Sequence, residues 1–383
     1  MDRRSFNRSL AATAVAAGFG TEARASTEYR GPNVILIRFG GGVRRLETID
    51  PQGTYAPTLL HSLAPRGVLI PDLRIDQQEG GDTSHAEGTL NILTGRYKGY
   101  RDAGAEFLRD RLEPTEPTLF EYLRSAYAIP SHQALLINGE DRQQEEFFTY
   151  GLHGHYGIDF RSEMLSLHRF KIYKTARILE EGGLTEEARA KTEAEYAKLL
   201  AADAREIAPE QSPEVTRFWA DWRAHYGDTG FKNPRGDRLL TELALRAMRT
   251  LRPRLMMVNY QDPDYVHWGN ASHYTRAIAV IDEGLARLVE RADSDPFYAG
   301  NTIFVITPDC GRDSNELIGL PFQHHFNTRS SREIWALIFG PGITQNRVLD
   351  RSVDQTVIAP TIAALMGMKA ERAEGDVLSG IGA

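Results

Sequence analysis

The sequence has a single cysteine, Cys310, among 383 residues. One cysteine cannot form an internal disulfide, and it cannot build a zinc site from cysteine ligands alone. The chain also lacks a strong charge imbalance, because 45 Lys and Arg residues stand against 52 Asp and Glu residues, for a formal net charge of −7. This balance argues against a protein that coats nucleic acid, and we expect no nucleic-acid partner.

Long hydrophobic runs are absent from the chain after residue 25. A helix that crosses a bilayer needs roughly 20 consecutive apolar residues, so we expect no membrane span after signal removal. Internal repeats and low-complexity runs are absent as well. Hydrophobic residues make up 41% and charged residues 25% of the composition, which is typical of a globular protein with two domains or one large α/β domain.

The first 25 residues have the organisation of an export signal. The paired arginines Arg3 and Arg4 precede a weakly apolar run over residues 10–20, which leads to the small residues Ala23 and Ala25. A basic start, an apolar middle and a small-residue cleavage site make a secretory signal, and the arginine pair indicates the twin-arginine type. We therefore predict a twin-arginine signal peptide over residues 1–25, export by the twin-arginine translocase, and a periplasmic or secreted mature protein.

Short apolar runs bounded by Gly or Pro alternate with stretches of helical spacing in the rest of the chain. This alternation predicts an α/β protein, and the first run, residues 33–37, is typical of a central parallel strand that ends in a glycine-rich loop. Charge-rich helical segments dominate between about residues 141 and 254, where we predict a helical insertion. The other predicted core strands are 67–70, 134–137, 255–260, 301–307 and 334–339.

Polar side chains follow the strand predicted at residues 255–260. Asp262, Asp264 and His267 lie between this strand and a stretch of helical spacing that starts at Tyr274. In open α/β sheets, ligands bind at the carboxyl ends of strands, and Asp and His are both common zinc ligands. The alternative is an ordinary polar loop with a surface histidine, and these residues alone do not decide between the two.

Two further groups of polar residues have similar positions. Thr83, Ser84 and His85 open a predicted helix, where free N–H groups favour an anion, although Thr83 and Ser84 are also good helix caps without any other role. Asp309 and Cys310 follow the strand at 301–307, and the thiol is either a metal ligand or a small buried apolar group. A later loop contains His324 and His325.

The chain resembles the alkaline phosphatase superfamily, which includes sulfatases and nucleotide phosphodiesterases. The resemblance covers most of the mature chain, residues 26–383, outside the helical insertion. It implies a large, central, mostly parallel sheet sandwiched by helices, and an activity on small anionic esters. The supporting stretches are 32–37, Leu90-Asn91-Ile92-Leu93-Thr94-Gly95-Arg96-Tyr97, 264–269, 301–311, Gly340-Pro341-Gly342 and Ile358-Ala359-Pro360-Thr361.

In this superfamily a metal ion or a pair of ions lies at the strand ends beside a hydroxyl or modified-cysteine nucleophile. The resemblance implies that one metal takes Asp264 or Asp262, His267, and His324 or His325. The nucleophile position falls on His85, with Ser84 and Thr83 just outside it. The position of the Asp-His pair of the second metal is occupied by Asp309 and Cys310, and the first strand runs into Arg38 where the family has an acid.

These changes leave two interpretations open. In the first, the second metal site is rebuilt, with His85 and Cys310 as ligands beside Asp309 and with Ser84 or Thr83 as nucleophile. In the second, the site is lost, and Arg38 places a fixed positive charge where a cation is bound in the family. We expect a divalent metal, zinc, and one ion rather than two, because a guanidinium close to a dication would weaken its binding.

The leading hypothesis is an exported, metal-dependent hydrolase of phosphate or sulfate esters. The alternative is a non-catalytic protein of the same fold that serves as a binding or assembly module. The altered nucleophile position and the missing acid after residue 37 motivate this alternative.

Overall fold

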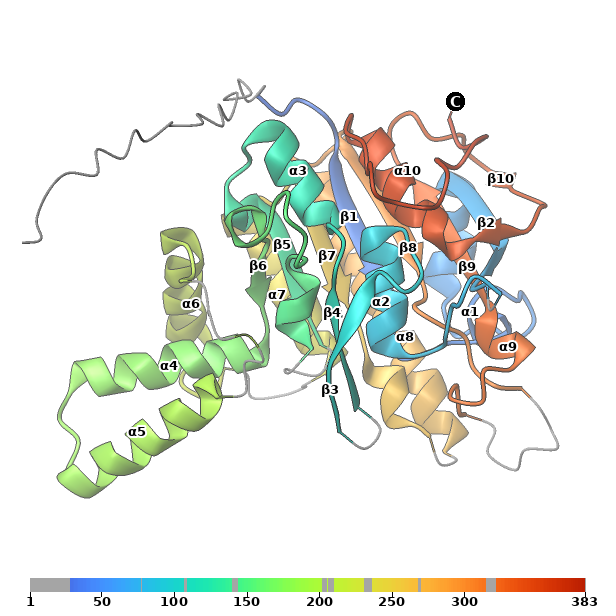
Figure 1. Ribbon diagram of the computed structural model, residues 1–383. Coiled ribbons are helices and arrows are strands. Elements are labelled where there is room, and N and C mark those ends of the chain that lie inside the picture. The colour runs from blue at the N-terminus through green and yellow to red at the C-terminus, as the bar shows by residue number, and fades with distance from the viewer. Residues whose placement is uncertain are drawn as a thin grey trace, which may run out of the picture.

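A mixed sheet of nine strands forms the centre of the protein (Figure 1). The computed structural model describes residues 28–76, 78–106, 109–139, 144–201, 205, 210–230, 236–267, 270–314 and 322–382, and the predicted signal peptide lies outside them. The strand order is β10-β2-β9-β8-β1-β7-β5-β6, with β11 paired to β2. The strands are β1 Asn33–Arg38, β2 Gly67–Arg74, β5 Ala134–Asn138, β6 Glu163–Leu165, β7 Leu255–Asn259, β8 Thr302–Thr307, β9 Glu333–Phe339, β10 Arg347–Val348 and β11 Val353–Asp354.

Five neighbouring strands, from β8 across to β6, are parallel, whereas β9 runs antiparallel to both β8 and β2. In β1 every residue is buried, because both faces of the sheet are covered and the strand is apolar throughout. The predicted fold class, a large and mostly parallel α/β sheet sandwiched by helices, is confirmed.

The register of the central strands determines where their loops leave the sheet. Arg38 at the end of β1 lies opposite Asn259 of β7 and Thr307 of β8. Because these three strands are parallel and end at the same level, the segments that follow them emerge together at one edge. The polar residues after β7 and β8 and the glycine-rich loop after β1 are therefore neighbours.

Helices cover the two faces of the sheet through two separate apolar clusters. Val34 and Leu36 of β1 face one cluster with α2, α3 and α10, whereas Ile35 and Ile37 face the other with α6, α7 and α8, as the alternation of a strand requires. The helices are α1 Arg45–Thr48, α2 His85–Thr94, α3 Leu119–Tyr127, α4 Leu167–Glu181, α5 Glu186–Leu200, α6 Pro213–Tyr226, α7 Asp237–Thr250, α8 Ala271–Ser294, α9 Arg329–Arg332 and α10 Ile358–Leu365.

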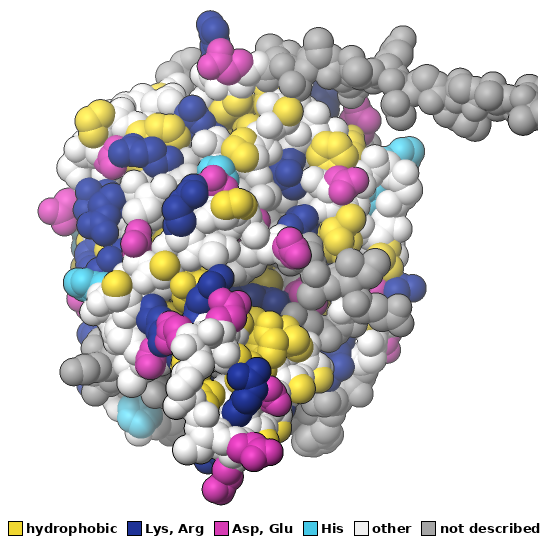
Figure 2. Space-filling model, turned by 90° about the vertical axis from the view of Figure 1, so that its left-hand side faces the viewer, with side chains coloured by type: hydrophobic (Ala, Val, Ile, Leu, Met, Phe, Trp, Pro, Cys, Tyr) yellow, Lys and Arg dark blue, Asp and Glu magenta, His cyan; other side chains and the backbone are white. Residues whose placement is uncertain are grey.

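The charge-rich region between residues 141 and 254 contains α4, α5, α6 and α7, together with the short strand β6. Strand β6 extends the central sheet beyond β5, and α4 and α5 project from the body at the left of Figure 1. On the face shown in Figure 2, acidic and basic side chains are mixed. The boundary that we predict for a helical insertion here stays a prediction.

A small antiparallel hairpin, β3 (Tyr100–Glu106) and β4 (Arg109–Pro114), stands apart from the main sheet. The sequence patterns did not predict it, because its strands are polar and lack a continuous apolar run. Among the described helices, none has the length and apolar character needed to cross a membrane.

Candidate metal centre

Three chain segments bring the candidate ligands to the sheet edge at which β1, β7 and β8 end. A short 3-10 helix, η6 (Asp262–Tyr265), follows β7 and carries Asp264, with His267 just after it. Helix α2 begins at His85, directly after its N-cap Ser84. The third segment is a loop before α9, which carries His324.

Three histidine side chains converge on one carboxylate oxygen, Oδ1 of Asp264. The Nε2 atoms of His85, His267 and His324 lie 2.6 Å, 2.8 Å and 3.3 Å from it. The His85, Asp264 and His324 ligand atoms all lie within 4.8 Å of one another, as do those of His267, His324 and His325. One carboxylate and several imidazoles at this spacing can surround a single metal ion.

The outer nitrogens of two of these histidines have fixed partners. The Nδ1 atom of His324 lies 2.8 Å from the carbonyl oxygen of Thr83, which can only accept a hydrogen bond, so Nδ1 carries the proton. The amide nitrogen of Gln323 donates to the His267 carbonyl at 2.7 Å, which leaves the Gln323 Oε1 atom to accept from His267 Nδ1 at 3.0 Å. Partners of this kind orient metal-binding histidines and select their tautomer.

The inward-facing nitrogens of these histidines have the chemistry of metal ligands. Burial lowers the pKa of His324 to about 3, so the ring is neutral and its Nε2 atom presents a lone pair to the Asp264 carboxylate. His267, whose Nδ1 atom faces the Gln323 oxygen, also directs its Nε2 atom to this carboxylate. The His324 lone pair and the carboxylate oxygen repel each other unless a cation lies between them, and these nitrogen and oxygen donors suit zinc. The residues fit a divalent metal ion.

His325 lies at the outer side of this group. Its ring stacks on that of His267 with a centroid distance of 5.2 Å and an interplanar angle of 7°. Burial is the main cause that lowers the pKa of His325, and its side chain is still exposed. His325 therefore lies at the solvent side of the group, within ligand distance of His267 and His324, whereas His324 is fully enclosed.

Asp262, the other candidate carboxylate, points away from the histidines. Its Oδ2 atom accepts a hydrogen bond from the backbone N–H of Asp237 at 3.1 Å, and Asp237 accepts from the N–H of Asp262 at 2.8 Å. This reciprocal pair joins η6 to the first residue of α7. The sequence offered Asp262 and Asp264 as alternative metal ligands, and of the two, Asp264 is the one that lies beside His267.

A second cluster contains His85, Asp309 and Cys310 within 4.8 Å of one another. Nδ1 of His85 contacts Oδ2 of Asp309, and Arg38 lies on the other side with Nη2 3.2 Å from the same oxygen. Burial acts to raise the pKa of Asp309, but the charges of Arg38 and His85 lower it to about 2. Arg38 also donates to the Thr89 hydroxyl at 2.7 Å.

The pKa values of Cys310 and His85 are both raised in this cluster, but for different reasons. Burial and the nearby charge of Asp309 raise the pKa of the Cys310 thiol to about 11, and its sulfur lies 3.8 Å from His85 Nδ1. Burial by itself would lower the pKa of His85, but the charges of Asp264 and Asp309 raise it well above the ordinary value. His85 is thus a positively charged bridge between the two carboxylates.

The three candidates for the nucleophile position have different surroundings. The Thr83 hydroxyl is buried and donates to the carbonyl oxygen of His324. Both ring nitrogens of His85 are engaged by carboxylates. Ser84 is partly exposed and accepts a hydrogen bond from the Glu87 N–H at 3.2 Å, so its own proton is not used for capping.

Two residues at this site had no assigned role in the sequence patterns. Gln323, directly before the two histidines, fixes the His267 ring. A polar amide next to two candidate ligands in the sequence is a pattern from which such a role could be predicted. Arg312 is fully buried and contacts the loops around the centre.

His153, from a histidine-rich loop, is not part of this centre. It binds Glu121 at 2.7 Å in a separate, buried contact.

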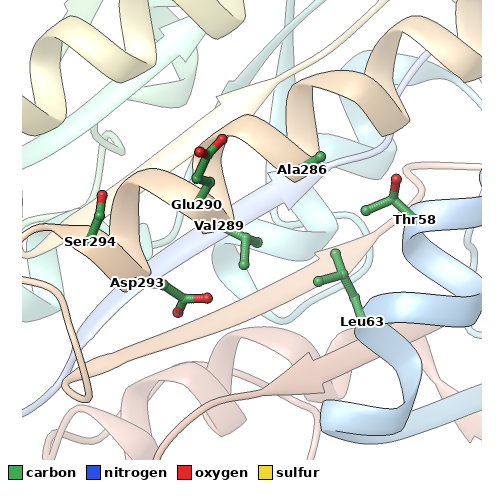
Figure 3. A pocket seen from close by; sticks show the side chains of 7 residues that line it. All are labelled: Thr58, Leu63, Ala286, Val289, Glu290, Asp293 and Ser294. Atoms are coloured by element: carbon green, nitrogen blue, oxygen red, sulfur yellow. The ribbon is translucent and has the colours of Figure 1, made fainter.

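The hollow drawn in Figure 3 is not part of the centre. It has a volume of about 470 Å³ and lies between residues 58–63 and the second half of α8. Its lining combines apolar side chains with two acidic ones, and none of them is a candidate site residue. The lining residues are Thr58, Leu63, Ala286, Val289, Glu290, Asp293 and Ser294.

Comparison with known families agrees with this geometry. A sequence model of the Metalloenzyme superfamily matches residues 163–370, more than half of the chain, including Asp264, His267, Asp309 and His324. The chain belongs to the Metalloenzyme superfamily. The predicted resemblance to alkaline phosphatases and sulfatases is confirmed, because this superfamily match is joined by structural neighbours of those kinds.

Solved structures share the fold of this Metalloenzyme superfamily protein at low sequence identity. An alkaline phosphatase superfamily protein from Vibrio parahaemolyticus has a TM-score of 0.55 at 14% identity, over 93% of this chain and 71% of its own. The alkaline phosphatase PafA has a TM-score of 0.54 at 12% identity, over 92% and 99%. A phosphonate monoester hydrolase from Silicibacter pomeroyi has a TM-score of 0.51 at 13% identity, over 92% and 76%. No curated protein matches the sequence.

Proposed function

We propose that this protein is an exported hydrolase of a phosphate or sulfate ester that works with one divalent metal ion, zinc. The observation that carries the proposal is the arrangement of His267 and His324. Each commits its Nδ1–H to a fixed acceptor and directs Nε2 to the same oxygen of Asp264. This geometry supports a metal ion among the three side chains, because one carboxylate and two imidazoles are the ligand types of an open catalytic zinc site.

In this proposal Asp264, His267 and His324 hold the metal, with His325 available at the solvent side. A bound divalent ion supplies Lewis-acid polarisation of an ester oxygen or lowers the pKa of a bound water. Gln323 and the Thr83 carbonyl keep the two imidazoles in the tautomer that binds metal. Their contribution is to orient the ligands before the metal arrives.

Arg38 and His85 support a single ion rather than a pair. Both contact Asp309, which is the carboxylate that remains from the second metal position of the resembling family. The guanidinium is permanently charged, and an imidazolium between two carboxylates is charged as well. We infer that these two organic cations perform the charge neutralisation of the second metal, and that the centre as a whole attracts a small anionic ester.

The nature of the substrate is supported by the structural neighbours. Among them are an alkaline phosphatase, a 2-O GAG sulfatase and a phosphonate monoester hydrolase. Ser84 is the candidate nucleophile, because this residue is partly exposed and lies at the N-terminus of α2. Free N–H groups at that helix end would bind the ester's anionic oxygens.

The test is a substrate panel assayed with zinc and with other divalent metals. The panel contains aryl phosphate monoesters, aryl phosphate diesters and aryl sulfates, and the matched protein is His267→Ala. We expect turnover of at least one class by the native protein and its loss in His267→Ala. Rates that are the same for both proteins on every substrate would contradict the proposal.

One observation favours the second candidate function, a non-catalytic binding or assembly module. Asp309 is buried and contacts Arg38 and His85. The position of the second metal ion in the resembling family is therefore closed to a substrate. A module of this kind would bind an anionic ester or its product without converting it. Calorimetric binding of a panel ester to the zinc-loaded protein, with no turnover of any panel member, would establish this alternative.

A further inference from the structure

Arg312 is a fully buried arginine, and within the described part of the chain its hydrogen bonds all go to backbone carbonyl groups. Its Nε atom donates to Gly42 at 2.7 Å. Its two terminal nitrogens reach four more carbonyls: Val266 at 2.7 Å and Phe322 from Nη1, and Gly41 and Pro263, each at 2.6 Å, from Nη2. The face of the guanidinium also lies over the ring of Tyr274, 5.1 Å from its centroid.

These five carbonyls belong to three segments that are far apart in the sequence. Gly41 and Gly42 form the loop after β1. Pro263 and Val266 lie on either side of Asp264, and Val266 immediately precedes His267. Phe322 lies two residues before His324. The arginine itself follows β8, so a single side chain joins the loops that leave β1, β7 and β8 to the loop that carries His324.

The loop after β1 is shaped for this close contact. Gly41 has a φ of +80°, and a Cβ atom there would lie 2.4 Å from the backbone nitrogen of Asp264, so only glycine fits. The β1 loop therefore packs directly on the backbone of η6, and Arg312 links the two through Gly41 and Pro263. This loop contains none of the candidate ligands.

We infer that Arg312 is a positioning residue for the metal centre, an inference that rests on the proposed function. Arg312 binds the carbonyls beside Asp264, His267 and His324, and so it fixes the distances between these three ligands. It does not itself touch the metal. Only arginine can do this, because its planar fork presents five N–H donors in fixed directions, whereas a lysine offers three donors from one atom.

The experiment measures zinc affinity by competition with a chelator and, separately, the thermal unfolding temperature in chelator alone. The variant is Arg312→Lys. The matched control is Arg124→Lys, because Arg124 also donates to two backbone carbonyls, Ile129 at 3.1 Å and Arg161 at 2.6 Å, which adjoin no candidate ligand. We expect both variants to unfold at lower temperature and only Arg312→Lys to bind zinc more weakly, by about 10- to 100-fold.

The outcomes separate this inference from the proposed function. Native protein that binds no zinc overturns both. Native protein that binds zinc, with an Arg312→Lys affinity within about twofold of it, overturns the inference alone and leaves Arg312 as a purely structural residue.

A second measurement covers the case in which Arg312→Lys does not fold. Amide hydrogen exchange of the native protein is compared with and without zinc. Because Arg312 couples the β1 loop to the ligand segments, we expect zinc to slow exchange in residues 39–44 as well as in residues 263–267. Zinc protection that is confined to the ligand segments would overturn the inference.

Discussion

The Nη2 atom of Arg38 lies 3.2 Å from Oδ2 of Asp309, and both side chains are completely shielded from solvent. Arg38 is the last residue of β1, where the resembling family has a metal-binding acid. Asp309 follows β8, which is the neighbour of β1 in the sheet. The chain thus has a guanidinium at one strand end paired with a carboxylate at the next, and in the proposed function this internal cation stands in for a second metal ion.

The first prediction concerns the number of metal ions. We expect about one equivalent of divalent metal per chain after dialysis, because the Asp264 group offers a carboxylate and two imidazoles, whereas Arg38 already pairs with Asp309 in the second cluster. Elemental analysis of protein purified without added metal measures this number. Two equivalents that persist, with one lost in Cys310→Ala, would instead establish a rebuilt second site with the thiolate as a ligand.

The second prediction concerns stability. Arg38→Met removes the guanidinium and leaves Asp309 buried, with His85 as its charged partner and the Gly42 N–H as a further donor. Breaking a buried ion pair from one side costs roughly 3–5 kcal/mol, and we expect a loss of unfolding free energy of about 3 kcal/mol, since the imidazolium remains. Urea denaturation in the presence of a chelator measures it. The double variant Arg38→Met, Asp309→Asn should recover part of the loss, because the uncompensated charge is gone.

Arg66→Met is the control for this change. Arg66 forms a two-bond pair with Asp293, but both side chains are about half exposed at the surface. Exposed pairs contribute about 0–1 kcal/mol. A similar loss for Arg66→Met and Arg38→Met would show that burial of the Arg38–Asp309 pair has no special energetic role.

The third prediction compares the two carboxylates of η6. Asp264→Asn should lower zinc affinity by at least about 100-fold, because it removes a charged ligand. Loss of a residue that only orients a ligand already lowers metal affinity by about 10- to 100-fold, and loss of the ligand itself should cost at least as much. Asp262→Asn should leave zinc affinity unchanged, since its carboxylate accepts from the N–H of Asp237 and the amide oxygen can do the same. Chelator competition measures both. Equal losses would mean that the two residues share the metal.

Much of the architecture could be predicted from local patterns. The runs at residues 34–37, 134–137 and 255–258 are continuously apolar, and each lies in a buried parallel strand. The strand β6 could not be predicted, because three residues carry too little periodicity. Its place in the sheet comes from pairing with β5, which is a long-range contact.

The candidate site was predictable in composition but not in arrangement. Asp264, His267 and His324 could be chosen because they follow strands or belong to a histidine pair. The sequence could not decide between Asp262 and Asp264, since the distinction depends on the N-terminus of α7, which binds Asp262. The role of Arg312 could not be predicted either. Its partners are backbone carbonyl groups, which every residue type has, so the sequence does not identify them.

The fourth prediction concerns export, and it depends on residues 1–25. Changing Arg3 and Arg4 together to Lys should retain the precursor in the cytoplasm, because the paired arginines are the feature that the translocase recognises. Cell fractionation followed by immunoblotting measures the distribution, with a Lys change at Arg8 alone as the control. Normal periplasmic delivery of the double Lys form would exclude the twin-arginine route.

The last prediction concerns Ser84. Thr83 donates a hydrogen bond to a buried carbonyl and His85 is held between two carboxylates, so the partly exposed Ser84 is the remaining candidate. Ser84→Gly removes the hydroxyl while costing only a few tenths of a kcal/mol as a helix cap. If Ser84 attacks the ester, kcat should fall by at least about 10³-fold with zinc affinity unchanged. Ser212→Gly, at the N-cap of α6, controls for loss of a cap and should keep full activity. Retention of activity in Ser84→Gly, together with its loss in His267→Ala, would assign the attack to water and leave Ser84 as a helix cap alone.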